Sequence, residues 1–93
     1  MNDQEARRAL HEILNRYRLR TYAELAMLVG NQETFEVPGE SGANYQIEIQ
    51  AVWEDKTRKI IRVLGAIDDG GVRAFMPVSD DFLITPDGEF VGE

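Results

Sequence analysis

The stretch Ile60–Met76, IIRVLGAIDDGGVRAFM, consists of two apolar runs on either side of Asp68-Asp69-Gly70-Gly71. An Asp-Gly step between apolar runs is the strongest short-range signal of a β-hairpin, because a type I′ turn needs a positive φ at both of its central residues. The stretch therefore predicts two antiparallel strands joined by a turn at Asp69-Gly70, with Ile67 opposite Val72.

Alternating apolar and polar residues predict another strand before this hairpin. Over 45–54 the apolar residues occupy every second position, with Val52 as the one interruption, and this is the pattern of a half-buried strand. A four-residue loop at 55–58 then leads into a strand at 59–67. Shorter strands are predicted at 34–37, 82–85 and 89–91, and the segment 77–81 is interpreted as a connection.

Two helices are predicted to precede the strands. The apolar residues of the segment 3–20 recur at helical spacing, and Asn2 or Asp3 is placed to cap its start. In the second helix Thr21 and Glu24 fit a capping box, and Gly30 is placed to end it. The expected fold class is α+β, in which an N-terminal helical pair (1–30) packs on an antiparallel β-meander (31–93) of four to six strands, all within one small domain.

The composition excludes several kinds of site. The chain of 93 residues has no cysteine and one histidine, His11, so it offers neither a disulfide nor the three or four nitrogen and sulfur ligands of a usual transition-metal site. The acids of the predicted turns do not have the spacing of a calcium-binding loop. We therefore predict no cofactor and no metal site, and no catalytic residue is identified.

Charge is distributed unevenly along the chain. The net charge is −7, and residues 63–93 carry seven acids against Arg73 alone. An acidic chain repels phosphate groups, which argues against nucleic acid and anionic membranes as partners. The acidic segment is interpreted either as a solubilising surface or as a face for a basic partner. The N-terminus has no apolar run of the length of a signal peptide or a spanning helix, so a soluble protein in the cytoplasm is expected.

The segment TYAELAMLVG, residues 21–30, resembles the first helix and turn of many helix-turn-helix DNA-binding domains. The resemblance implies that a recognition helix follows Gly30. The next residues, NQETFEVPGE, contain acids and Pro38 and no basic residue, whereas a recognition helix enters the negatively charged major groove. DNA binding is therefore the least favoured function.

The predicted register leads to a candidate interaction surface. The loop lengths set Trp53 opposite Ile60 and Ile49 opposite Leu64, and the segment 59–67 is then apolar on both faces, although two helices can cover only one. Our hypothesis is that the second face is an interface, most simply of a homodimer. The alternative is an intramolecular core closed by Phe82, Ile84 and Phe90. The candidate residues are Ile61, Val63, Met76, Arg62 and Arg73.

The two arginines of this set have two interpretations. In the predicted register Arg62 and Arg73 share a face with Trp53, where they could contact an anion or an acidic peptide. Alternatively, they pair with Asp80, Asp81 or Glu89 at the edge of the core.

By elimination, the sequence favours a non-enzymatic binding or interaction module that uses a sheet face or an acidic loop edge to bind a protein partner. The alternative is a small enzyme whose carboxylates and arginines come together only in the fold.

Overall fold

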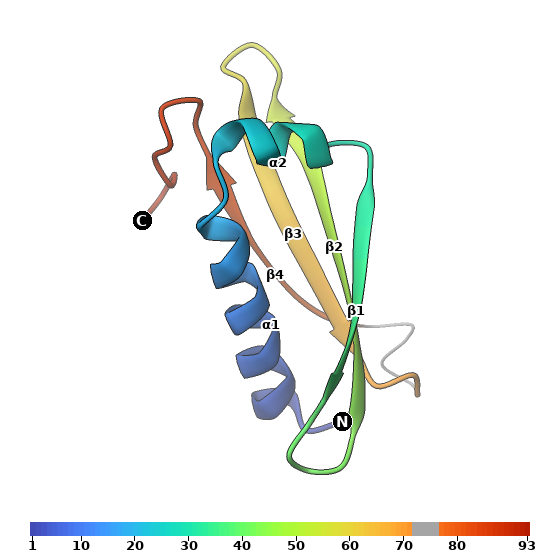
Figure 1. Cartoon of the computed structure of the whole chain (residues 1–93). Coiled ribbons are helices and arrows are strands. Elements are labelled where there is room, and N and C mark those ends of the chain that lie inside the picture. The colour runs from blue at the N-terminus through green and yellow to red at the C-terminus, as the bar shows by residue number, and fades with distance from the viewer. Residues whose placement is uncertain (72–76) are drawn as a thin grey trace.

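The computed structural model describes residues 1–71 and 77–93 and confirms the α+β fold class (Figure 1). Two N-terminal helices precede an antiparallel sheet whose four strands, within the described residues, lie in the order β1-β2-β3-β4. The elements are α1 (Asp3–Arg18), α2 (Tyr22–Leu28), β1 (Gln32–Pro38), β2 (Asn44–Asp55), β3 (Ile60–Asp68) and β4 (Val78–Ile84).

Both helices begin where the sequence predicts. The side chain of Asn2 accepts a hydrogen bond from the Glu5 N–H at 3.1 Å, and Thr21 and Glu24 form the capping box of α2. These side chains pair backbone donors that the first turn of a helix leaves free. Gly30 follows α2 with a φ of +86°, as the predicted left-handed end requires. The next element is β1, so the recognition helix implied by the helix-turn-helix resemblance is not present.

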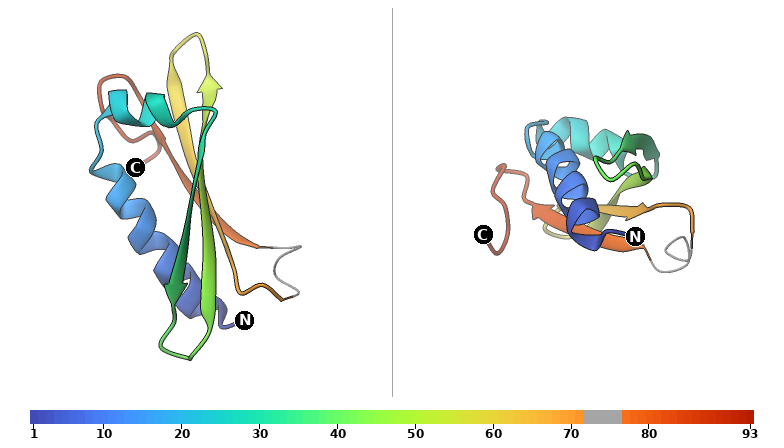
Figure 2. Two further views of the ribbon diagram at one scale, coloured as in Figure 1. Left: turned by 45° about the vertical axis from the view of Figure 1, so that its right-hand side comes forward. Right: turned by 90° about the horizontal axis from the view of Figure 1, so that it is seen from below.

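Helices α1 and α2 lie on the same face of the sheet, which is also the side on which the core lies (Figure 2). From α1 the apolar stripe predicted by the sequence is buried, and from the sheet every second residue of β3, and of β2 as far as Ala51, is buried. We call this the inner face. Its fully buried sheet residues are Tyr45, Ile47, Ile49, Ile61, Val63 and Ile67.

The register between β2 and β3 differs by one residue from the prediction. Trp53 pairs with Ile61 and Ile49 pairs with Gly65, with a register shift between Trp53 and Asp55. The cause is Lys59, which has a φ of +58° and belongs to the loop rather than to the strand. Because strand side chains alternate, this single step moves Ile61 and Val63 to the same face as Ile49.

The partner of β3 on its other edge is also different. Ile67 pairs with Val78, so the predicted pairing of Ile67 with Val72 is wrong. The predicted return strand, 72–76, lies outside the described residues. Gly70 has the expected positive φ of +82°, but Asp68 accepts a hydrogen bond from its N–H at 2.7 Å, a side-chain turn that needs no strand pairing.

Strand β4 begins at Val78, earlier than predicted, and the chain after it folds back against it. The predicted strand at 89–91 is reduced to an isolated bridge between Ile84 and Phe90. The Arg18 guanidinium lies 4.7 Å from the ring centroid of Phe82 and 4.8 Å from that of Phe90. These contacts fix the C-terminal segment beside the end of α1.

Candidate interaction face around Arg62

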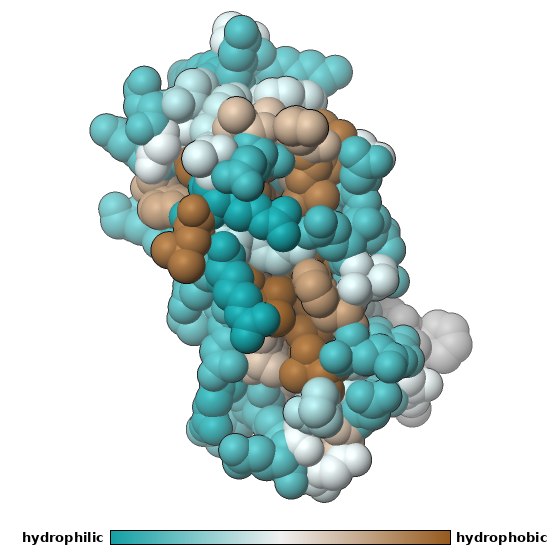
Figure 3. Space-filling view, viewed as in Figure 1, coloured by the Kyte–Doolittle hydropathy of each residue, from teal (hydrophilic) through white to brown (hydrophobic). Residues whose placement is uncertain are grey.

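The sheet has a second face, which we call the outer face, on the side away from both helices (Figure 2). The strand pairs bring its polar and apolar side chains into rows that cross the sheet. One row is Val52, Arg62 and Leu83, and the next is Gln50, Leu64 and Asp81. By contrast, the helical side is hydrophilic over most of its surface, with an apolar strip between α1 and β1 (Figure 3).

Acids outnumber bases on the outer face. Among the described residues, the alternation of the strands places one base there, Arg62, and five acids: Glu36, Glu48, Glu54, Asp68 and Asp81. Two shallow hollows lie on it. One of about 390 Å³ is lined by Arg62, Leu64 and the segment 79–81, and one of about 370 Å³ is lined by residues of β1 and β2 that include Glu36 and Glu48.

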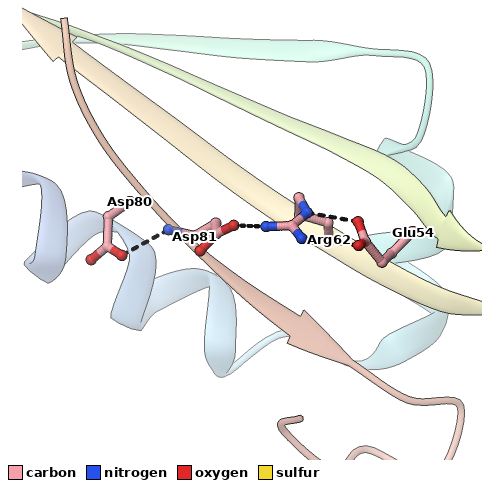
Figure 4. A network of polar contacts seen from close by, with 4 residues as sticks. All are labelled: Glu54, Arg62, Asp80 and Asp81. Atoms are coloured by element: carbon pink, nitrogen blue, oxygen red, sulfur yellow. Dashed lines mark hydrogen bonds and ion pairs between the residues drawn. The ribbon is translucent and has the colours of Figure 1, made fainter. Parts of the chain in front are cut away.

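Arg62 links three strands of the outer face (Figure 4). Its Nε donates to Glu54 Oε2 at 2.7 Å and its Nη2 to Glu54 Oε1 at 3.0 Å, while its Nη1 donates to Asp81 Oδ2. Glu54 belongs to β2 and Asp81 to β4, so the guanidinium bridges across β3. This two-pronged geometry is the strong form of an arginine–carboxylate pair. The alternative in which Arg62 pairs with Asp81 is confirmed.

The pairing determines what these groups can do. The hydrogen bonds from Arg62 lower the pKa of Glu54, and the carboxylate raises the pKa of Arg62 in return. A carboxylate held ionised by an arginine is a poor general acid. A guanidinium that already donates to carboxylates along two edges has few free N–H groups with which to bind a further anion. The cluster of Glu54, Arg62 and Asp81 therefore contributes structure and charge to the outer face and does not present a reactive group.

The pairing makes a prediction about acid titration. In Arg62→Gln the pKa of Glu54 should rise toward its ordinary value, because its charged partner is gone. A lowered pKa in the fold contributes stability above the unfolded-state pKa that is lost as the pH falls through the folded value, so this variant should lose less stability on acidification. Carboxyl ¹³C shifts of Glu54 and unfolding between pH 7 and 3 measure both effects. Arg58→Gln, in the adjacent loop, is the control, and an unchanged Glu54 titration in Arg62→Gln would contradict the prediction.

The structure separates the other candidate residues. Ile61 and Val63 are fully buried together with Phe82 and Ile84, in the arrangement of the intramolecular alternative, and they present no surface to a second molecule. Trp53 lies on the opposite side of the sheet from Arg62, because Arg62 pairs with its neighbour Val52. Met76 and Arg73 lie outside the described residues.

The acids that define the outer face were not among the candidate residues. Their signal was present in the alternation of Gln46, Glu48 and Gln50 with buried neighbours, but the prediction used that alternation only to find the strand. The pairing of Glu54 with Arg62 depends on the register shift beside Glu54, and no local pattern indicates it.

Other functional classes receive no support from the described part of the chain. No group of three or more histidine, cysteine, aspartate or glutamate side chains is arranged there to hold a metal ion. Neither described helix combines the length and the apolar character that crossing a membrane requires. The chain matches no family model, no curated protein and no solved structure.

Proposed function

We propose that this protein is an interaction module whose outer face binds a basic protein partner. The observation that carries the proposal is a sheet face that no described element covers and that bears five acids, with its one described base, Arg62, already paired. Complementary charge of this kind steers a partner toward a surface and selects among partners.

The outer face also has apolar area for a partner to cover. Val52 is 40% exposed, and Leu83 on β4, in the same row, and Leu64 on β3, in the next row, are half-buried. Interfaces combine an apolar centre with a polar rim, and here Glu36, Glu48 and Asp68 lie to one side of the apolar residues and Glu54 to the other. A partner surface that carries both apolar and basic side chains would match the apolar residues and the acids of the outer face. The proposal includes a cytoplasmic setting, since a chain without cysteine gains nothing from an oxidising compartment.

A synthetic amphipathic helix of leucine and lysine is a suitable probe, titrated into ¹⁵N-labelled protein at 0.15 M salt. We expect amide shifts to concentrate on the outer-face residues of β2, β3 and β4. Glu48→Lys should weaken binding about fivefold, because it reverses a charge within the face.

The matched control is Glu12→Lys, which makes the same change of charge at an exposed position of α1. It should weaken binding less than twofold if the face, rather than the net charge, is recognised. Equal weakening by both substitutions, or shifts spread over the helices, would contradict the proposal.

A further inference from the structure

The end of the β2–β3 hairpin projects beyond both α2 and the start of β1 (Figure 2). Strand β1 pairs with β2 only as far as Gln32 with Gln50, whereas β3 accompanies β2 to Asp55. Within the described residues, the β1 side of the segment 51–55 has one further partner, an isolated parallel bridge from Val29 to Ala51. The edge of β2 over Val52–Asp55 is therefore left without a neighbouring strand.

A hollow lies along this open edge. Its volume of about 510 Å³ is the largest of those described here, and its apolar lining comes from Val29, Ala51, Val52 and Trp53. Trp53 is 37% exposed and Val52 is 40% exposed, so both side chains present apolar surface to the hollow. The segment of β2 that has no neighbouring strand thus also lines the hollow with apolar side chains.

The charge around this hollow is opposite to that of the outer face. Lys56 lines it, and Lys59 follows in the same loop. Arg58, between them, is paired with Asp55 at 3.6 Å, so these two charges offset each other. Glu54 does not cancel this charge, since its carboxylate is paired with Arg62. An acidic ligand is favoured here.

From these observations we infer that the open edge of β2 binds an extended, acidic and apolar peptide segment of a partner protein, added as a strand beside Val52–Asp55. Strand addition supplies backbone hydrogen bonds to the unpaired edge, and alternate side chains of the added strand enter the pockets on one face. Here the apolar residues would pack against Trp53 and Val29, and the acids between them would meet Lys56. This site shares Val52 with the outer face but takes a partner of the opposite charge along the edge of β2.

Trp53 is the only tryptophan in the chain, so its fluorescence reports on this site alone. The probe is an acetylated and amidated octapeptide of alternating glutamate and valine. We expect a blue shift of Trp53 emission on titration, together with amide shifts at 51–55. The same peptide with alternate N-methylated backbone nitrogens should bind at least tenfold more weakly, because it cannot pair with the edge.

Two further measurements test the charge. Lys56→Glu should weaken binding of the octapeptide about tenfold, whereas Arg16→Glu, the same reversal at an exposed position on α1, should leave it within twofold. A lysine–valine octapeptide should not shift Trp53. The inference is overturned if the glutamate–valine peptide leaves Trp53 emission unchanged, if the N-methylated peptide binds equally well, or if the amide shifts fall on β1 instead.

Discussion

Replacing Gly65 by alanine is expected to destabilise the fold by about 1–3 kcal/mol, the usual cost of forcing extra atoms into a packed core. Gly65 lies in the middle of β3 on the inner face, directly under α1. A Cβ built on it would lie 2.7 Å from Leu10 Cδ1 and 2.8 Å from Ile49 Cδ1. Both of these side chains are buried, so neither can move aside without disturbing its own neighbours. Urea unfolding of the two proteins measures the difference.

Ala66→Val is the matched control, because it adds two methyl groups at the next residue of the same strand, on the outer face. No helix covers that face, so the larger side chain should cost less than 0.5 kcal/mol. If Gly65→Ala were as stable as the parent protein, α1 would lie farther from the sheet than the structure places it. Gly65 does not have a positive φ, so an alanine there causes no backbone strain. A loss of stability in Gly65→Ala would therefore show that the glycine is needed for close packing against α1.

Local signals in the sequence were sufficient for the elements of this fold and insufficient for its long-range pairing. The capping box at Thr21 and Glu24 and the alternation of 45–53 act through neighbouring residues, and the corresponding α2 and β2 were predicted correctly. The Asp69-Gly70 step was only partly informative, since Gly70 has a positive φ but Asp69 does not, and the predicted type I′ turn is not formed. It did not determine which strand pairs with β3. That choice depends on how Val78, Phe82 and Ile84 bury against the helices, and a dipeptide carries no information about it.

The error at Lys59 shows how one residue can change the interpretation of a whole face. Left-handed backbone is uncommon for lysine, so a sequence pattern assigns this position to the strand by default. Moving the strand start by one residue exchanges the two faces of β3, and it turned a core into a predicted interface. The outer face, in contrast, became visible only once the register was known, because its acids come from four different strands.

The largest effect is expected for Val63→Asp, which should leave the protein unfolded at neutral pH. Val63 is 0% exposed on the inner face. The substitution removes about 1.5–3 kcal/mol of apolar burial and places a carboxylate in a core with no buried polar or charged residue among those described, at a further cost of several kcal/mol. A domain of this size has a total stability of about 5–14 kcal/mol, so the sum approaches or exceeds it. Far-UV circular dichroism and thermal unfolding are the direct measurements.

Val52→Asp makes the same chemical change one strand away and should behave in the opposite manner. Val52 is 40% exposed on the outer face and lies opposite Arg62, so the new carboxylate stays hydrated and faces a base. We expect a folded protein whose stability lies within about 1 kcal/mol of the parent. The pair also tests the two interpretations of the apolar residues of β3. A folded, monomeric Val63→Asp protein would mean that Val63 faces a partner, whereas an unfolded one beside a stable Val52→Asp protein assigns Val63 to the core and leaves the outer face as the surface available for binding.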